Sequence, residues 1–472
     1  MTAAPTRFVD RRTRIAYSAP GFAMALVGIP IFVYLPKFYT DVVGVSMWVF
    51  GAIFFAGRVV GAVTDPLFGY LSDRTRSRMG RRRPYLAFGA IPLAIAVLVL
   101  YIPPEMGHTA STVWFGVGSF TYFLMWTLVT IPWRSLGPEL TPDYDERTAL
   151  FGIRDGTIVA GTMVAAAMPT LLGAVVDGDR ARFALYAMLS VPVLVGTFLT
   201  CAFLVRERPA PAERREGSLL GGVVEAIRNR PFRILLGSYT VAAFASNLPA
   251  SLIPYYTQYV LHADVVAPIF ILYFAVGILC LPFWVRLSRR IGKRNAFLWA
   301  TAVNSGSFLG VFFLGDGQVE AYFVLVALAG VGGCAWLVLP NSMQADVIDY
   351  DELLSGQRRE GQFVGLWSFA DMFAAAIGVT IALAVLERAG YVPNVEQSPH
   401  VLFTLRVLYV LVPVGCNLLS FALALAYPID RVRHEAIRAG IAARQSGRAV
   451  ADPLVAGRII GEDVVVTKAT GA

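Results

Sequence analysis

One acidic residue, Asp65, lies inside a long apolar segment, where a charge is unfavourable. It falls within the apolar run 46–71, and if that run crosses a membrane, an ionised carboxylate there costs about 3 kcal/mol. Arg58 precedes it by seven positions, about two helical turns, so both side chains lie on one helix face roughly 10 Å apart. Such an acid can bind and release a proton or a cation. A structural hinge beside Pro66, paired with Arg58, is the alternative.

Three threonines could complete a cation site around Asp65. Hard cations such as Na⁺ prefer oxygen ligands, and hydroxyl groups can supply them next to a carboxylate. A proton would need only the carboxylate, so the residue types leave H⁺ and Na⁺ both open. We expect no other cofactor and no metal centre, since the four cysteines lie in apolar stretches without metal-ligand spacing. The proposed hydroxyl ligands are Thr64, Thr127 and Thr130.

A second set of residues interrupts the other apolar runs and could bind a small molecule. Arg154 is the main candidate, because a guanidinium group binds carboxylate, sulfate or phosphate through paired hydrogen bonds. An ion pair with Asp155 is an equally good explanation, and Arg134 could instead extend to the water interface. The candidate set is Arg58, Arg134, Arg154, Asp155, Tyr255, Tyr256, Trp336, Asn341 and Asp371.

The composition requires that most of the chain lies in lipid. Of 472 residues, 56% are apolar and 15% charged, whereas soluble domains have about 45–50% and 25%. A transmembrane helix needs about 20 apolar residues, and twelve runs approach that length. We therefore predict an all-α membrane protein and, without HExxH, Walker or GxSxG motifs, no enzyme. The runs are 17–39, 46–71, 84–102, 112–134, 149–176, 183–205, 232–260, 266–287, 295–315, 320–342, 361–387 and 401–427.

Basic residues alternate between the two sides of the predicted membrane. Arginines crowd the connections 74–83, 206–215 and 286–294, whereas 103–112 contains no Lys or Arg. The positive-inside rule places the basic loops and both termini in the cytoplasm, and the chain in the cytoplasmic (inner) membrane. This orientation explains much of the net charge of +8, so we predict no nucleic-acid partner.

Two internal echoes indicate a duplicated architecture. The segment 65–88 is echoed at 281–297, and the tetrapeptide DYDE occurs at 143–146 and again at 349–352. Parallel repeats of this kind form pseudo-symmetric halves in many carriers. We expect a six-helix bundle at 1–205, a cytoplasmic linker at 206–230, a second six-helix bundle at 231–427 and a solvated tail at 428–472.

Several longer segments resemble one transporter family. GYLSDRTRSRMGRRR (69–83) resembles the loop signature of the major facilitator superfamily. Together with YTDVVGVS (39–46), IPWRSLGPELTPDYDERT (131–148) and ADVIDYDELLSGQRREG (345–361), it is similar to the glycoside-pentoside-hexuronide:cation symporter family. The resemblance implies a monomeric carrier, embedded in membrane lipid, that moves a sugar-like small molecule with Na⁺, Li⁺ or H⁺ by alternating access.

The chain departs from this family at several working positions. The family's cation site has two carboxylates one turn apart, and here Gly61 replaces the first, while Thr127 keeps a hydroxyl. Fewer negative charges favour a proton over a bare metal ion, and the remaining arginines suit an anionic glycoside such as a uronide. The other departures are Ala25, Thr130, Arg134 and Met372.

The resemblance also implies charged latches in the basic loops. Asp73 matches the superfamily's loop acid, and the two DYDE segments supply acids near loop arginines. Surface ion pairs contribute only about 0–1 kcal/mol each, which suits contacts that must break and reform. The predicted gating residues are Asp73, Arg147, Asp349, Arg358 and Arg359.

Two other functions remain open at this point. A related branch of the superfamily moves lysophospholipids with a cation, and the added arginines would suit a lipid headgroup. A protein with a carrier fold could also act as a membrane sensor or scaffold without transporting anything. A counterflow assay in proteoliposomes separates all three.

Overall fold

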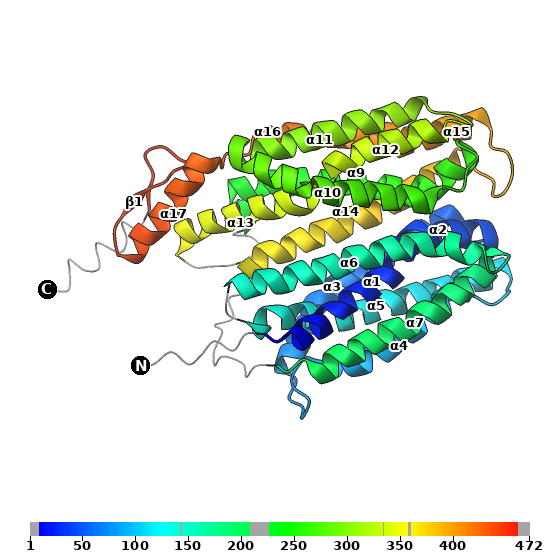
Figure 1. The fold of residues 1–472 in the computed structure, drawn as a ribbon, viewed down its shortest axis with the longest axis horizontal. Coiled ribbons are helices and arrows are strands. Elements are labelled where there is room, and N and C mark those ends of the chain that lie inside the picture. The colour runs from blue at the N-terminus through cyan, green and yellow to red at the C-terminus, as the bar shows by residue number, and fades with distance from the viewer. Residues whose placement is uncertain (1–8, 142–143, 208–225, 334, 357–359, 461–472) are drawn as a thin grey trace. The chain divides into compact units, whose positions relative to one another are not determined.

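The computed structural model is almost entirely helical over the part of the chain that it describes (Figure 1). Within that part, eleven helical segments are long and apolar enough to cross a membrane. The exceptions to helix are connections and one pair of two-residue strands, β1 (Val450–Ala451) and β2 (Ile459–Ile460). The described residues are 9–141, 144–207, 226–333, 335–356 and 360–460.

The difference between eleven spans and the predicted twelve concerns the run at 232–260. It forms a helix, α9 (Arg230–Tyr259), which is not among the eleven apolar segments. Polar residues at Ser238, Thr240, Asn247 and Gln258 lower its hydropathy. The fold is all-α, as predicted, and the number twelve stays a prediction.

The described residues divide into two compact units. Unit 1 joins Met1–Ala212 to Ala250–Ile271 and Ala376–Arg406. Its helices pack mainly as the pairs α1 with α6, α3 with α5, α4 with α5 and α4 with α7. They are α1 (Arg11–Val33), α2 (Leu35–Phe38), the π-helical turn η1 (Tyr39–Val43), α3 (Met47–Arg74), α4 (Arg83–Tyr101), α5 (His108–Leu140), α6 (Tyr144–Gly173) and α7 (Asp179–Leu204).

Unit 2 contains Glu213–Pro249, Leu272–Ala375 and Val407–Ala472. Three helices contribute to both units: α9, α10 (Val266–Ile291) and α14 (Glu360–Arg388). The units are therefore not the two sequence halves, and the predicted boundaries at 205 and 231 stay a prediction. Helix α15 (Pro399–Arg406) lies in unit 1. The helices wholly within unit 2 are α11 (Lys293–Gly310), η2 (Val311–Phe313), α12 (Val319–Gly333), α13 (Ala335–Ser355), η3 (Val407–Leu411), α16 (Val412–Leu425) and α17 (Arg431–Gln445).

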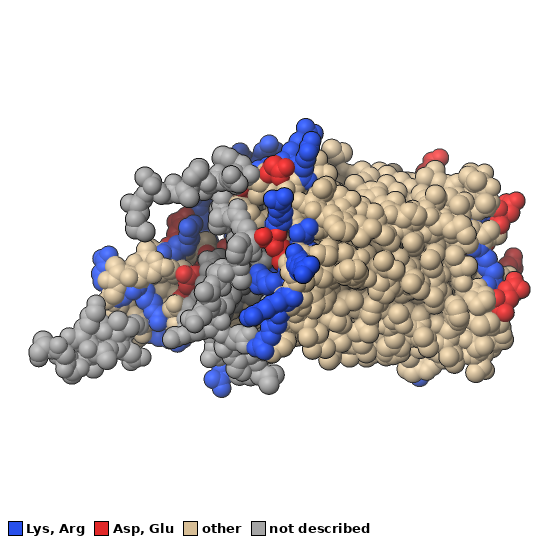
Figure 2. Space-filling model, turned by 90° about the horizontal axis from the view of Figure 1, so that it is seen from below, with Lys and Arg blue, Asp and Glu red and all other residues tan. Residues whose placement is uncertain are grey.

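Large apolar side chains point outward from the helices of each unit. Val63, Phe88 and Leu171 in unit 1, and Leu279 and Phe313 in unit 2, are more than half exposed. On the face shown in Figure 2, a broad surface carries few charged side chains, and Lys and Arg gather at one of its ends. Extensive exposed apolar area is what a helix surface in contact with lipid requires.

The described part of the tail packs against unit 2 and is not a free, solvated appendage as the sequence suggests. His434 of α17 places Nε2 3.3 Å from Asp346 and 3.1 Å from Asp349, both on α13. Lys293 approaches Asp346 at 2.6 Å. Ile437 is fully buried, so an apolar contact accompanies the charges. The expectation of a solvated tail is wrong because α17 contacts acidic residues about 85 positions earlier in the chain. The local sequence pattern does not reveal such distant contacts.

Helices α1 and α6 pack so closely that one position between them requires glycine. A Cβ at Gly161 would overlap the carbonyl oxygen of Phe22 and crowd the side chain of Ala25. We therefore expect Gly161→Ala to lower the free energy of unfolding by about 1–3 kcal/mol. Thermal unfolding in detergent would measure it. Gly152→Ala on the same helix is the control, because its Cβ would meet open space; equal stability of the two variants would contradict the prediction.

Candidate functional site

Asp65, on α3, lies in unit 1 among several of the residues predicted to accompany it. Its Oδ1 atom is buried and has no hydrogen-bond partner among the described residues. The carboxyl group interacts with the Thr127 hydroxyl of α5 and with the positive charges of Arg134 and Arg58. A buried polar atom without a partner is uncommon in folded proteins and invites an explanation. A proton or a bound cation would satisfy this oxygen.

The threonine hydroxyls near Asp65 use their protons on the backbone. Thr130 Oγ1 donates to the carbonyl of Trp126 at 2.6 Å, and Thr64 Oγ1 donates to that of Val60 at 2.8 Å. Because each hydroxyl proton is already donated, these oxygens can only accept a hydrogen bond or bind a cation through their lone pairs. The structure brings Thr127 to Asp65, while no described contact joins Thr64 or Thr130 to it.

The missing second carboxylate has an identifiable place. A Cβ built at Gly61, one turn before Asp65 on α3, would lie 3.5 Å from Thr127 Oγ1. That is an ordinary van der Waals distance, so the position has room for a side chain directed at the same hydroxyl. The site as it stands holds one carboxylate beside two arginines.

Arg58 is held by aromatic rings as well as by charge. Its guanidinium carbon lies 4.2 Å from the ring centre of Phe32 and 5.5 Å from that of Phe123. Cation–π contacts of this kind stabilise an arginine away from water. Arg134, by contrast, is exposed on α5. The positive charge of Arg58 therefore reaches Asp65 from among aromatic rings, and that of Arg134 reaches it from an exposed position.

Arg154 and Asp155, adjacent on α6, form the ion pair that the sequence left open. Arg154 Nη2 lies 2.8 Å from Asp155 Oδ1, and Nε donates to the same oxygen at 2.9 Å. The guanidinium also lies over the ring of Phe151 at 4.6 Å. Because Asp155 is largely exposed, an anionic ligand could displace it. The predicted contact with a substrate therefore requires competition with this carboxylate.

Unit 2 contains an aromatic cluster around Asp371, a predicted site residue on α14. Tyr239 of α9 donates its hydroxyl to Asp371 Oδ1 at 3.0 Å and stacks on Trp367 at 3.9 Å between ring centres. Trp336 of α13 lies 6.4 Å from Tyr239 and 4.8 Å from Phe297. The sequence predicted Trp336 and Asp371 but missed Tyr239. Asn341 is exposed on α13.

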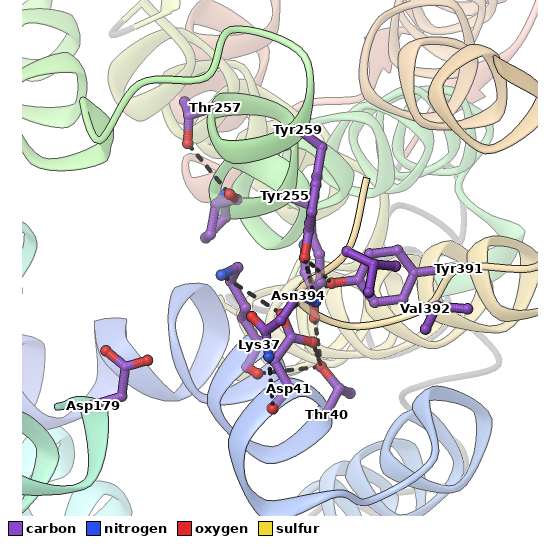
Figure 3. A network of polar contacts seen from close by, with 12 residues as sticks. Lys37, Thr40, Asp41, Asp179, Tyr255, Thr257, Tyr259, Tyr391, Val392 and Asn394 are labelled. Carbon is purple, nitrogen blue, oxygen red and sulfur yellow. Dashed lines mark hydrogen bonds and ion pairs between the residues drawn. The ribbon is translucent and has the colours of Figure 1, made fainter. Parts of the chain in front are cut away.

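Tyr255 of α9 belongs to a polar network that the sequence did not reveal. Its fully buried hydroxyl lies 3.1 Å from Thr40 Oγ1 of η1, and Thr40 donates to Asp41 Oδ1 at 2.8 Å (Figure 3). The Tyr391 hydroxyl donates to Asp41 Oδ2 at 2.9 Å and lies 3.0 Å from the Tyr259 hydroxyl. We call Thr40, Asp41, Tyr255, Tyr259 and Tyr391 the far-end latch.

The latch ties together segments of unit 1 at the end opposite to the loop 74–83, here called the far end. Lys37 lies 3.6 Å from Asp41 and supplies the matching charge. The α14 residue Glu387 accepts a hydrogen bond from Ser46 at 2.9 Å and another from the backbone N–H of Trp48, at the start of α3. A carboxylate at a helix N-terminus is stabilised by the helix dipole. Polar contacts, some of them buried, thus hold these segments of unit 1 together at the far end.

Burial raises the pKa of Asp41 above its ordinary value of 3.8, although Lys37 and neighbouring hydroxyls oppose the shift. The closed latch therefore binds a proton more tightly than a water-exposed Asp41 would. The closed latch is most stable at a pH below the ordinary pKa of Asp41. Its stability falls as the pH rises through the raised pKa that Asp41 has in the closed latch.

Removing the Tyr391 hydroxyl is expected to loosen the latch. In Tyr391→Phe, the buried Asp41 carboxyl loses a donor, a change that costs about 1–3 kcal/mol. Hydrogen–deuterium exchange of residues 39–46 and 389–395 should then accelerate about 10-fold or more. Tyr70→Phe is the control, since Tyr70 is a half-exposed residue of α3 outside the latch. Unchanged exchange in Tyr391→Phe would show that the latch does not hold the far end closed.

The other predicted residues are only partly described. Tyr256 is fully buried on α9, next to Tyr255. Asp349 contacts His434 at 3.1 Å, a partner within unit 2 that the sequence did not indicate. Arg358 and Arg359, and the side chains of Asp73 and Arg147, lie outside the described residues. Their gating role stays a prediction.

Eleven membrane-length helical segments among the described residues, one of them carrying Asp65, define the class: a multi-pass membrane protein. The nucleoside transporter NupG, in a mutant form, has the same fold, with a TM-score of 0.62 at 14% identity, covering 88% of this chain and 99% of that one. The family model described as "MFS/sugar transport protein" matches residues 16–431. The chain belongs to that family, which confirms the resemblance seen in its motifs.

Two curated relatives extend this assignment. An isoprimeverose transporter of Lactiplantibacillus pentosus is 29% identical, covering 89% of this chain and 89% of the relative. A glucuronide carrier protein homolog of Escherichia coli is 28% identical, covering 89% of this chain and 92% of the relative. Both alignments cover nearly the whole of each protein.

Proposed function

We propose that this protein is a symporter that moves a sugar-like solute together with a proton by alternating access. The relatives named for isoprimeverose and glucuronide support the solute class. The observation that carries the coupling is the buried Asp65 oxygen, which has no partner among the described residues.

A proton fits this site better than Na⁺. One carboxylate faces one threonine hydroxyl, and Arg58 and Arg134 already supply positive charge. A bare metal ion would need more oxygen ligands and more negative charge than Asp65 provides. Moving one charge through 100 mV supplies about 2.3 kcal/mol, which supports roughly 50-fold accumulation of the solute. A single proton is therefore sufficient.

The solute is proposed to be a glycoside with an acidic group, such as a uronide. Arg154 would exchange its contact with Asp155 for a bidentate contact with the ligand carboxylate. Taken by itself, unit 2 also carries groups suited to a sugar: the rings of Tyr239, Trp336 and Trp367 are stacking surfaces, and Asp371 is an acceptor for hydroxyls. We place the protein in the cytoplasmic membrane with both termini in the cytoplasm, on the basis of its arginine-rich loops. The family resemblance is the basis for proposing a monomer.

Transport by purified protein in proteoliposomes tests this function. The probes are a labelled methyl β-D-glucuronide, isoprimeverose and methyl β-D-xyloside, assayed by counterflow and then with an imposed pH or Na⁺ gradient. We expect exchange of at least one probe, and accumulation driven by an inwardly directed proton gradient. Absence of exchange would contradict transport of these sugars, and accumulation driven only by Na⁺ would contradict proton coupling.

A further inference from the structure

A cavity of about 530 Å³ lies at the far end of unit 1. It forms between the α2–η1 corner, α7 and the end of α9, and its size is typical of small-molecule sites. None of the residues predicted above to bind cation or substrate lines it. It is therefore separate from the Asp65 and Arg154 region.

The side chain of Gln258 lines this cavity with a buried oxygen that lacks a hydrogen-bond donor among the described residues. The Oε1 atom of Gln258, on α9, is buried and accepts no hydrogen bond from the described residues. Leaving such an acceptor unsatisfied costs about 1–3 kcal/mol. The neighbouring Thr257 hydroxyl is already used, because it donates to the carbonyl of Ile253 at 2.9 Å. A ligand hydroxyl could donate to Gln258 instead.

The charges in the wall favour a neutral, hydroxyl-rich ligand. Asp179 of α7 lies across from Lys37 and Asp41 (Figure 3), and it pairs with Arg182 at 3.4 Å. With Asp264, three acids line the wall, against the two basic residues Lys37 and Arg182. The wall therefore carries no excess of positive charge. Carboxylates already balanced by a basic neighbour can accept hydrogen bonds from sugar hydroxyls without attracting a free cation.

Aromatic rings provide the apolar surface that a sugar ring needs. Phe38 of α2 and Phe183 of α7 stack at 4.2 Å between ring centres, and both line the cavity. Tyr34 and Tyr186 line it as well. A pyranose ring presents C–H groups on its faces and hydroxyls at its edge, which matches aromatic surface beside polar acceptors.

We propose that this cavity is a second solute site, which binds the neutral sugar ring of a glycoside next to the far-end latch. The proposal rests on the proposed function and deepens it, since the ring bound here is a neutral part of the transported glycoside and not the part that carries its acidic group. The latch residue Asp41 lines the cavity, and so does Lys37, its ion-pair partner. A sugar hydroxyl that competes for Asp41 would weaken the latch, so this site binds solute where the far end must open.

Cysteine protection tests this site directly. The four native cysteines are replaced by alanine, and Ala263→Cys places a thiol at the cavity wall. Alkylation of purified protein by a maleimide is measured with isoprimeverose, methyl β-D-xyloside or methyl β-D-galactoside as the probe. At a probe concentration of about twice its Kd, alkylation should slow about threefold. Val395→Cys, which is 49% exposed and does not line the cavity, should show no protection.

Second-site changes separate this site from the proposed transport site. Gln258→Leu should remove the protection with no loss of thermal stability, whereas Gln445→Leu, an exposed change on α17, should keep it. Asp65→Asn should keep it too, even where uptake fails. Protection without transport would overturn the proposed function but not this site. Transport without protection by any probe, or protection that survives Gln258→Leu, would overturn the site.

Discussion

Replacing Asp65 by asparagine is expected to abolish uphill uptake of the solute while leaving exchange intact. The amide keeps the shape of the side chain but can neither bind nor release a proton. The buried Oδ1 that lacks a partner among the described residues would no longer couple charge movement to transport. The accumulation ratio should fall from about 50-fold at 100 mV to unity.

The measurement is uptake into proteoliposomes under a proton gradient, beside counterflow in its absence. Glu105→Gln is the matched control, because it makes the same chemical change at an exposed position in a helix connection. That variant should accumulate solute normally. Normal accumulation by Asp65→Asn would mean that another group carries the proton, and loss of counterflow as well would mean that Asp65 is structural.

Gly61→Asp is expected to make transport responsive to Na⁺. The new carboxylate would lie one turn from Asp65 on α3, with its Cβ 3.5 Å from Thr127 Oγ1. Two carboxylates and a hydroxyl form the kind of oxygen-rich site that a hard cation needs. We expect Na⁺ to stimulate counterflow about 10-fold or more, equivalent to about 1.4 kcal/mol of added binding.

Gly69→Asp provides the matched control for this change. It also places a carboxylate one turn from Asp65 on α3, but a Cβ there would meet the Ile131 side chain at 3.7 Å and no hydroxyl. Added negative charge alone would make both variants respond to Na⁺. A response in Gly61→Asp only would assign the effect to the Thr127 side of the helix, and no response in either would refute the proposed geometry.

The features predictable from the sequence are those encoded over short distances. Asp65 and Arg58 share one helix face because they are seven residues apart, and an acid in an apolar run stands out by itself. Some helix boundaries follow the apolar runs closely, as α4 (Arg83–Tyr101) shows against the predicted 84–102. Others extend past them, as α13 does by continuing to Ser355 where the predicted run ends at 342. Of the twelve predicted runs, the one that forms α9 is not among the apolar segments found in the described residues, because its polar residues lower its hydropathy.

The features that the sequence could not predict depend on contacts between distant residues. Asp41 meets Tyr391 across 350 positions, and Thr40 meets Tyr255 across 215. Nothing in the local pattern of Tyr239 distinguishes it from a membrane-interface tyrosine, yet it contacts Asp371. Motif comparison could have suggested Asp41, since it belongs to YTDVVGVS, but not its partners.

Helix α9 changes from one unit to the other between Pro249 and Ala250, and α14 does so between Ala375 and Ala376. A proline has no amide hydrogen to donate, so the backbone hydrogen-bond ladder of α9 is interrupted at Pro249. Helix α9 therefore bends more easily at this position than an uninterrupted helix would. Pro249→Ala would restore the missing donor and stiffen α9 there without changing any of the proposed ligand-binding residues.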